Sequence, residues 1–222
     1  MNISLLADKL EVLSRPDRLL ILSGSGDASA AGKKLQVTAR LKADRGVIEL
    51  PKGDTPKPSD DVIVLDQSKA ADNKNLPYAL SFNLDLDLGE RFFVKGQGLD
   101  AQLGGAVKLS SMDGAFPSSN GNIRVIKGSF SAYGQRLEIE RGILNFQGPL
   151  DNPGLDIIAM RKNQPVEAGV AITGTAQSPR VRLVSNPGVP DSEKLSWLVL
   201  GHGLEDASGQ DFNALQIGRA HV

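Results

Sequence analysis

Few residues in this sequence have the types and spacing that catalysis or metal binding requires. His202 stands in the run Gly201-His-Gly203, with no second histidine close to it and no cysteine anywhere in the chain. A zinc-type site needs several such ligands, brought together at characteristic spacings. We therefore expect His202 to cap a helix or to lie on the surface.

Two groups of carboxylates could bind a cation, and neither pattern is specific. Asp85 and Asp87 lie two residues apart, so in a strand both would point to the same solvated face. Asp151, Asn152 and Asp156 are similar to a calcium loop only superficially. The PLDNP run around the first two is more typical of a rigid turn between strands.

Familiar catalytic motifs do not occur in the sequence. Gly24-Ser-Gly26 lacks the third glycine and the following helix of a dinucleotide-binding loop, so we interpret it as a turn. No GxSxG, HExxH or P-loop pattern is found. The 25 basic and 26 acidic residues give a net charge of −1, which argues against nucleic-acid binding. We expect no enzyme, no metal and no cofactor.

Repeated alternation of apolar and polar residues predicts that most of the chain forms β-strands. Successive side chains of a strand point to opposite faces, so each run has one apolar and one polar face. The apolar members of the clearest runs are Val37, Ala39, Leu41 and Ala43; Phe82, Leu84, Leu86 and Leu88; Leu103, Gly105, Val107 and Leu109; and Val166, Ala168, Val170 and Ile172. One-sided strands favour an antiparallel or meandering sheet.

Glycine divides the second half of the chain into short units. Gly121, Gly128, Gly134, Gly142 and Gly148 recur every six to eight residues. We interpret each unit as a short strand that ends in a tight turn. This quasi-repeat is typical of a solenoid or of a long curled sheet, in which each strand contacts only its neighbours.

Helical signals are scarce and lie near the C-terminal end. Residues 190–200 predict one helix, with Asp191 or Ser192 as its N-cap and Gly201 at its end. A second helix is expected to start near Asp211. Residues 52–77 are rich in Pro, Asp, Lys and Asn and predict a mobile loop, with VIVL as a short anchor.

These patterns divide the chain into five segments. They are a β-sheet segment (1–51), the mobile loop (52–77), a second β region (78–189), a helical segment (190–216) and residues 217–222. The last segment, IGRAHV, matches one translation of a common sequencing adapter, so we expect it to be an artefact. No stretch has the roughly 20 apolar residues of a spanning helix, and the N-terminal run is not a signal peptide.

The predicted strands present more apolar surface than the predicted helix can cover. The sheet must curl on itself, pair with a second sheet or hold an apolar guest. Aromatic residues make up only 5% of the chain, so the apolar face is mainly aliphatic. A smooth aliphatic wall suits an acyl chain, although a plain aliphatic sandwich core is the simpler interpretation.

Three stretches, residues 128–154, 166–191 and 193–201, carry a family resemblance. They contain GILNFQGPLDNP, EAGVAITGTAQSPRVRL and EKLSWLVLG in this order. The combination closely resembles the C-terminal domain of the TamB family, a relative of the AsmA-like bridge proteins for lipid transfer. The resemblance covers about residues 2–216.

The resemblance implies a mostly β fold, an elongated curled sheet or β-taco with a hydrophobic concave interior and a short C-terminal helix. It implies a periplasmic part of a protein anchored in the inner membrane, with a TamA-like outer-membrane barrel protein as partner. The implied function is to conduct phospholipid between the membranes and to support assembly of outer-membrane proteins and secretion of autotransporters.

The inward positions of the predicted strands would line a groove for phospholipid acyl chains. They are Phe82, Leu84, Leu86, Leu88, Val107, Leu109, Phe130, Leu137, Ile139, Leu144, Phe146, Val170 and Ile172. The alternative is a chaperone-like module whose open sheet edge pairs with strands of nascent outer-membrane proteins.

Overall fold

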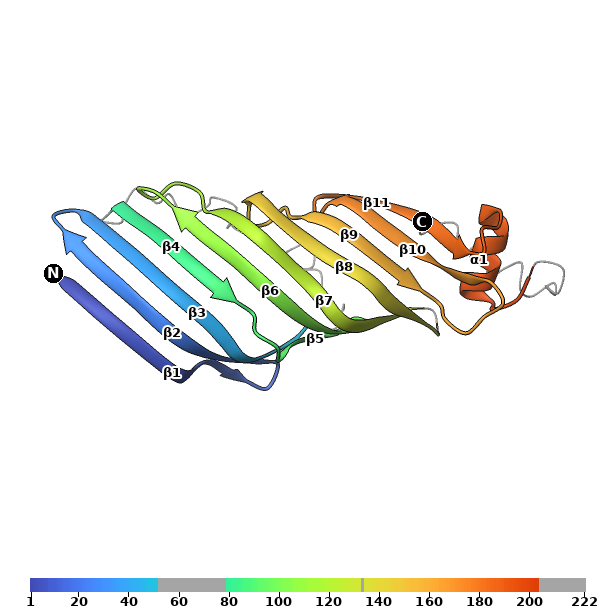
Figure 1. Cartoon of the computed structure of the whole chain (residues 1–222), viewed down its shortest axis with the longest axis horizontal. Helices are drawn as coiled ribbons and strands as arrows, with labels where there is room; N and C mark the ends of the chain where they lie inside the picture. Colours follow the sequence, from blue (N-terminus) through green and yellow to red (C-terminus); the bar gives the residue numbers. More distant parts are fainter. Residues whose placement is uncertain (52–78, 133, 204–222) are drawn as a thin grey trace, which may run out of the picture.

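The computed structural model describes residues 1–51, 79–132 and 134–203, which form one long curled sheet with a helix at one end (Figure 1). The elements are β1 (Asn2–Arg15), β2 (Arg18–Ala31), β3 (Lys34–Glu49), β4 (Ala79–Asp87), β5 (Phe92–Gly96), β6 (Leu99–Ser111), β7 (Ser118–Ala132), β8 (Gln135–Pro149), β9 (Gly154–Met160), β10 (Glu167–Thr175), β11 (Ser178–Asn186) and α1 (Asp191–Val199). The sheet is not closed into a barrel, because its two outer strands, β1 and β11, do not pair with each other. The predicted curled, mostly β fold is confirmed.

The strands follow one another across the sheet in nearly the order of the sequence. The order is β1-β2-β3-β4-β6-β7-β8-β9-β10-β11, and β5 pairs with β3 and β6. All pairs are antiparallel except β3 with β4 and β3 with β5, which the expectation of an antiparallel sheet missed. Parallel neighbours require a long connection, which residues 50–78 supply between β3 and β4.

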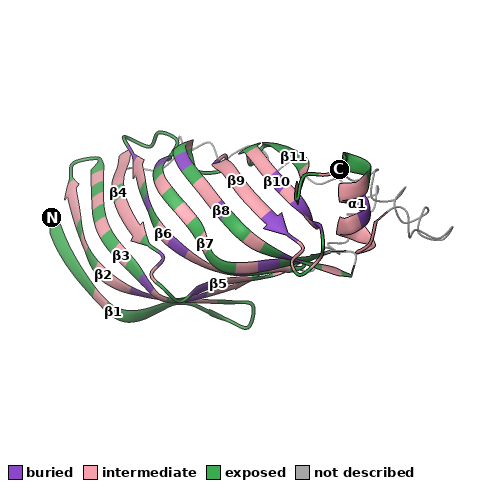
Figure 2. Cartoon of the chain, turned by 45° about the vertical axis from the view of Figure 1, so that its right-hand side comes forward, coloured by how far each residue is buried: buried purple, intermediate pink, exposed green. Residues whose placement is uncertain are grey.

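The strand register places the apolar residues of successive strands on one face. Val37 of β3 lies beside Phe82 of β4, and Leu84 of β4 lies beside Leu109 of β6. In Figure 2, half-buried and exposed residues alternate along β3, as the period of two requires. We call the side that carries Val37, Phe82 and Leu84 the apolar face, and the other side the polar face.

The interpretation of the glycine repeats as turns is confirmed for Gly134, which lies between β7 and β8, and was wrong for most of the others. Gly121 and Gly128 lie inside β7, Gly142 lies inside β8, and the Gly24-Ser-Gly26 run lies inside β2. Crowding on the apolar face explains Gly142, because a Cβ built there would come within 2.5 Å of the Val125 Cγ2 atom. These glycines therefore belong to long strands, and their lack of a side chain relieves contacts within the sheet.

The core lies on the apolar face at one end of the first strands. Leu22, Ala43, Leu88 and Phe92 are each at most 8% exposed and form one cluster, although they come from β2, β3, β5 and the segment after β4. A Cβ built on Gly46 would lie 2.3 Å from the Phe92 ring, so this ring covers the backbone of β3. The curled sheet therefore packs against itself here without enclosing the rest of its apolar face.

Helix α1 forms where the sequence predicts a helix, but not with the predicted cap. Pro190 is the N-cap residue, and neither Asp191 nor Ser192 makes a side-chain capping hydrogen bond. Proline fixes a φ suited to the entry of a helix, which explains this start without a side-chain cap. In the part of the chain that the structure describes, no helix is long and apolar enough to cross a membrane.

The remaining predictions fall on residues outside the described ranges. They concern the loop at 52–77 with its VIVL anchor, the helix start near Asp211 and the hexapeptide 217–222. The strands of 1–51 and those after residue 78 belong to a single sheet.

Candidate functional site

The thirteen predicted groove residues all lie on the apolar face. Pairing across the strands links Leu86 to Val107, Phe130 to Leu137 and Val170 to Leu183, and alternation within each strand places the others. The full set extends over β4, β6, β7, β8 and β10, plus Leu88 just after β4. The alternation in these strands therefore places the thirteen residues on one face, whereas their contact with lipid stays a prediction.

Burial separates these residues into four buried residues, one exposed residue and eight half-buried residues. Leu88, Val107, Leu137 and Phe146 are 6–7% exposed and contribute to packing within the sheet. Phe130 is 37% exposed. The other members are Phe82, Leu84, Leu86, Leu109, Ile139, Leu144, Val170 and Ile172, which are half-buried. A half-buried aliphatic row can give up its remaining water contact to an apolar ligand.

An apolar hollow of about 260 Å³ lies on the same face between β1, β2 and β3. Its lining includes Leu5 of β1, Gly26 and Ala28 of β2, and Val37 and Leu41 of β3. Small residues in the middle strand, between larger residues on both sides, leave this space open. An acyl chain that enters it would contact aliphatic side chains on two sides.

The predicted groove set missed this hollow. Val37 and Leu41 belong to an alternating run that the sequence shows clearly, but the groove set begins only at Phe82. Ile3, Leu5 and Ala7 of β1 also alternate with polar or exposed positions and carry the same signal. What the sequence does not show is that β1, β2 and β3 join β4 in one sheet, which extends the apolar face to these residues.

Helix α1 is held against the far end of the sheet by side chains from β8 and from the residue after β9. Gln135 Nε2 donates to the Val199 carbonyl at 2.9 Å, and Arg161 Nη1 donates to the Trp197 and Leu198 carbonyls at 3.1 and 3.2 Å. Gln135 alternates with Leu137, so it lies on the apolar side. The C-terminal end of α1 therefore covers the apolar face only near these strand ends.

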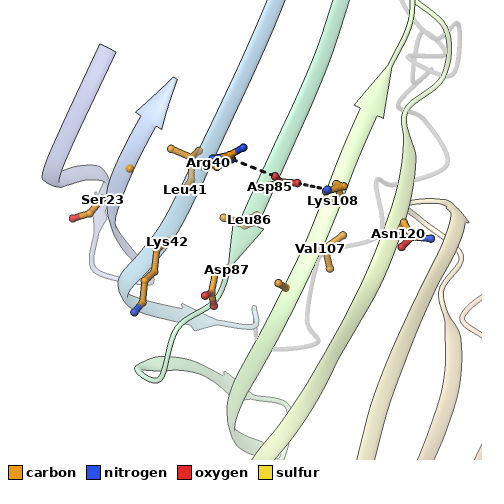
Figure 3. A pocket seen from close by; sticks show the side chains of 12 residues that line it. Ser23, Arg40, Leu41, Lys42, Asp85, Leu86, Asp87, Val107, Lys108 and Asn120 are labelled. Atoms are coloured by element: carbon orange, nitrogen blue, oxygen red, sulfur yellow. Dashed lines mark ion pairs between the residues drawn. The ribbon is translucent and has the colours of Figure 1, made fainter. Parts of the chain in front are cut away.

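The polar face carries paired charges. Asp85 on β4 lies between Arg40 of β3, at 3.9 Å, and Lys108 of β6, at 3.4 Å (Figure 3). These three charged residues, together with Asp87 and Asn120, line part of a hollow of about 560 Å³. Asp87 Oδ1 accepts a hydrogen bond from the Gly89 N–H. The two aspartates thus have partners on a solvated strand face, as predicted.

A second charged group lies between β8 and the start of β10. Lys162 pairs with Glu140 and with Glu167, the latter at 2.8 Å. The hydrogen bonds that Lys162 donates to Glu140 and, to a lesser extent, to Glu167 raise the pKa of Lys162 above its usual range. The hydrogen bond from Lys162 lowers the pKa of Glu167. These side chains remain partly exposed, so the group links β8 to the start of β10 and offers no buried acid or base.

The weaker site candidates belong to a turn and to the segment after α1, where they make hydrogen bonds. The PLDNP run forms the predicted turn between β8 and β9, where Asn152 Oδ1 accepts from the Gln177 N–H at 3.0 Å. The His202 carbonyl accepts from Ser196 Oγ at 2.7 Å, just after α1. Within residues 1–51, 79–132 and 134–203, no three acidic, histidine or cysteine side chains gather as metal ligands would.

Comparison with known proteins agrees with this architecture. The sequence model of the TamB C-terminal domain matches residues 1–220. The translocation and assembly module subunit TamB of Haemophilus influenzae is 31% identical over 145 residues, which are 63% of this chain and 11% of that protein. The chain thus matches only a small part of this relative's length. A match over nearly the whole chain places it in one family: the chain belongs to the TamB C-terminal domain family.

Proposed function

We propose that this chain holds phospholipid acyl chains on its apolar face, as one section of a path for lipid between two membranes. The observation that carries the proposal is the continuous aliphatic face of an open sheet, half-exposed over most of its length. Each methylene that leaves water contributes about 0.8 kcal/mol. A few contacts therefore hold a chain, while similar neighbouring positions allow it to slide.

We infer the setting of this activity from the family. The relative from Haemophilus influenzae is a subunit of a translocation and assembly module. By analogy, the chain would act in the periplasmic part of an inner-membrane protein, with a TamA-type outer-membrane partner. Support of outer-membrane protein assembly and autotransporter secretion would be the cellular result.

The test uses pairs of neighbouring residues with opposite orientation. Val37→Asp places a carboxylate in the hollow, whereas Thr38→Asp places the same group on the exposed polar face of β3. Leu84→Asp and Asn83→Asp form a second such pair on β4. Lipid occupancy is measured by native mass spectrometry and by displacement of a fluorescent fatty acid.

We expect Val37→Asp and Leu84→Asp to weaken binding of the fatty acid about tenfold or more, because each replaces apolar contact with a charge. Their partners, Thr38→Asp and Asn83→Asp, should bind as the unaltered chain does. Equal binding by all four folded variants would show that the apolar face is not the binding site.

A second candidate function, chaperone-like strand pairing, is favoured by the β1 edge. This strand pairs with β2 alone in the described sheet, and Leu5, Leu6 and Leu10 are each more than half exposed. An incoming strand could add to such an edge by main-chain hydrogen bonds. Replacing Ser4 or Leu6 with proline should then abolish binding of a β-hairpin peptide while fatty-acid binding persists.

A further inference from the structure

Exposed apolar side chains gather on two neighbouring turns at one end of the sheet. Ser118 at the start of β7 pairs with Pro149 at the end of β8, so the β6–β7 and β8–β9 turns lie at the same end. Phe116 is 94% exposed, Met112 is 80% exposed and Leu150 is 46% exposed. We call these three residues the hairpin rim. Such exposure of large apolar groups on protruding turns is costly in water and points to a partner.

The opposite end of the sheet has no comparable group among the described residues. Its described turns include residues 16–17, 97–98 and 161–166, and none of these holds a large exposed apolar side chain; residue 133 of the β7–β8 turn lies outside the described ranges. The described turns at both ends are short connections between antiparallel strands, and those that carry the hairpin rim differ from the others in their side chains.

The hairpin rim adjoins the apolar face. A hollow of about 700 Å³ opens between the two turns and is lined by Phe116, Leu150 and their proline neighbours. Directly below it, Ser119 Oγ donates to the Gly148 carbonyl at 2.8 Å. Only this row of small residues separates the rim from Phe146, which belongs to the predicted groove set.

The charges beside the rim balance. Lys34 pairs with Asp113 at 3.7 Å, and Asp151 accepts a hydrogen bond from Gln177 at 3.2 Å. Lys33, in the β2–β3 turn, adds a second base at the same end of the sheet. A surface without net charge suits zwitterionic headgroups and gives no preference for an anionic surface.

From these features we propose that the hairpin rim inserts into the interface of a zwitterionic phospholipid bilayer. The inference rests on the proposed function, because lipid carried on the apolar face must enter from a membrane or leave to one. Separate side chains on protruding turns can enter the headgroup region one by one, whereas a protein partner of ordinary strength requires a broad complementary surface. The rim would then place Phe116 among acyl chains and the apolar face next to the lipid.

The experiment measures co-flotation of the full chain with phosphatidylcholine–phosphatidylethanolamine vesicles. We expect Phe116→Asp to weaken partitioning about tenfold or more, and Met112→Asp and Leu150→Asp to weaken it less. The matched control is Leu6→Asp, which alters an 84% exposed leucine on β1, away from the rim. Partitioning should change little with salt or with added anionic lipid.

Fluorescence gives an independent readout. In Phe116→Trp, the emission of the new indole should shift to shorter wavelength on addition of vesicles, beyond any change of Trp197 in the unaltered chain. Absence of both flotation and this shift would overturn the proposal. So would an equal loss of flotation in Leu6→Asp, because the attraction would then be general adhesion of apolar surface.

Fatty-acid binding separates this proposal from the proposed function. Phe116→Asp should keep fatty-acid binding, whereas Leu84→Asp should lose it and still float with vesicles. If the unaltered chain binds the fatty acid but does not float, only the membrane proposal fails. If it floats but binds no fatty acid, the lipid-binding face is wrong and the rim is a membrane anchor of another kind.

Discussion

Single residues on the apolar face determine how closely β3 and β5 can approach. Gly46 lies beneath the Phe92 ring, and Phe92 also packs with Leu22 and Leu88. The ring can occupy this position only because position 46 has no side chain. The core at this end therefore depends on a glycine that the sequence pattern does not single out.

We predict that Gly46→Ala destabilises the protein by about 1–3 kcal/mol, the usual cost of overpacking a core. The added methyl would lie where the Phe92 ring now stands, so the ring or the strand must move. Chemical denaturation measures the change. Gly188→Ala is the control, because nothing lies within 4 Å of a Cβ built there. Equal stability of both variants would contradict the proposed crowding.

The Lys162 group predicts a dependence of stability on pH. The pKa of Glu167 is lowered in the folded chain, so its contribution is present above its ordinary pKa of 4.5 and is lost as the pH falls. The pKa of Lys162 is raised, so its contribution is present below 10.5 and is lost as the pH rises further. The group therefore stabilises the fold between these limits.

Thermal unfolding over a range of pH tests this expectation. Lys162→Ala should lower the Tm at neutral pH, and the difference from the unaltered chain should shrink below about pH 4. Lys127→Ala changes an exposed lysine of β7 and should have little effect at any pH. A Tm difference that does not vary with pH would show that Lys162 acts by packing alone.

At the scale of the element, α1 depends on the strands for its stability. It has nine residues, no side-chain N-cap and no basic residue in its last turn. Isolated helices of this length are marginal in water, and their last carbonyls need partners. Arg161 supplies both a hydrogen-bond donor and a positive charge at this negative end of the helix dipole.

Arg161→Ala should release α1 while the sheet stays folded. Trp197 is the only tryptophan in the chain, so its fluorescence reports on the helix directly. We expect the emission to shift toward that of a solvent-exposed indole, and acrylamide quenching to increase. Arg161→Lys should keep part of the unaltered Trp197 emission, and Arg180→Ala on β11 should leave this emission unchanged. Unchanged Trp197 emission in Arg161→Ala would mean that other contacts hold the helix.

At the scale of the whole molecule, the sheet has one hydrophobic core cluster and two edge strands, β1 and β11. The core cluster joins β2, β3, β5 and the segment after β4, whereas β1 pairs with β2 only and exposes most of its side chains (Figure 2). Sheets built from sequential neighbours open locally at strands with few buried contacts. Protection should therefore differ along the molecule.

Hydrogen–deuterium exchange followed by mass spectrometry should show this gradient. Peptides from β1 should exchange at least about tenfold faster than those from β3 and β6, because opening β1 exposes little buried surface. Bound fatty acid should slow exchange in β1–β3 if it occupies the hollow. Uniform protection from β1 to β6 would indicate that the sheet unfolds as one unit.

The sequence alone determined that most of the chain is β-strand with one apolar face, and it determined the position of α1, because alternation and helix punctuation are local properties of the chain. Val37, Phe82 and Leu84 were assigned correctly to one side of their strands for this reason. Tertiary structure decided what local pattern does not encode. The parallel pairing of β3 with β4 and β5 extends the apolar face to Leu5, and crowding by Val125 and Phe92 explains Gly142 and Gly46. Both depend on which strands become neighbours, and that is fixed by packing between residues far apart in the sequence.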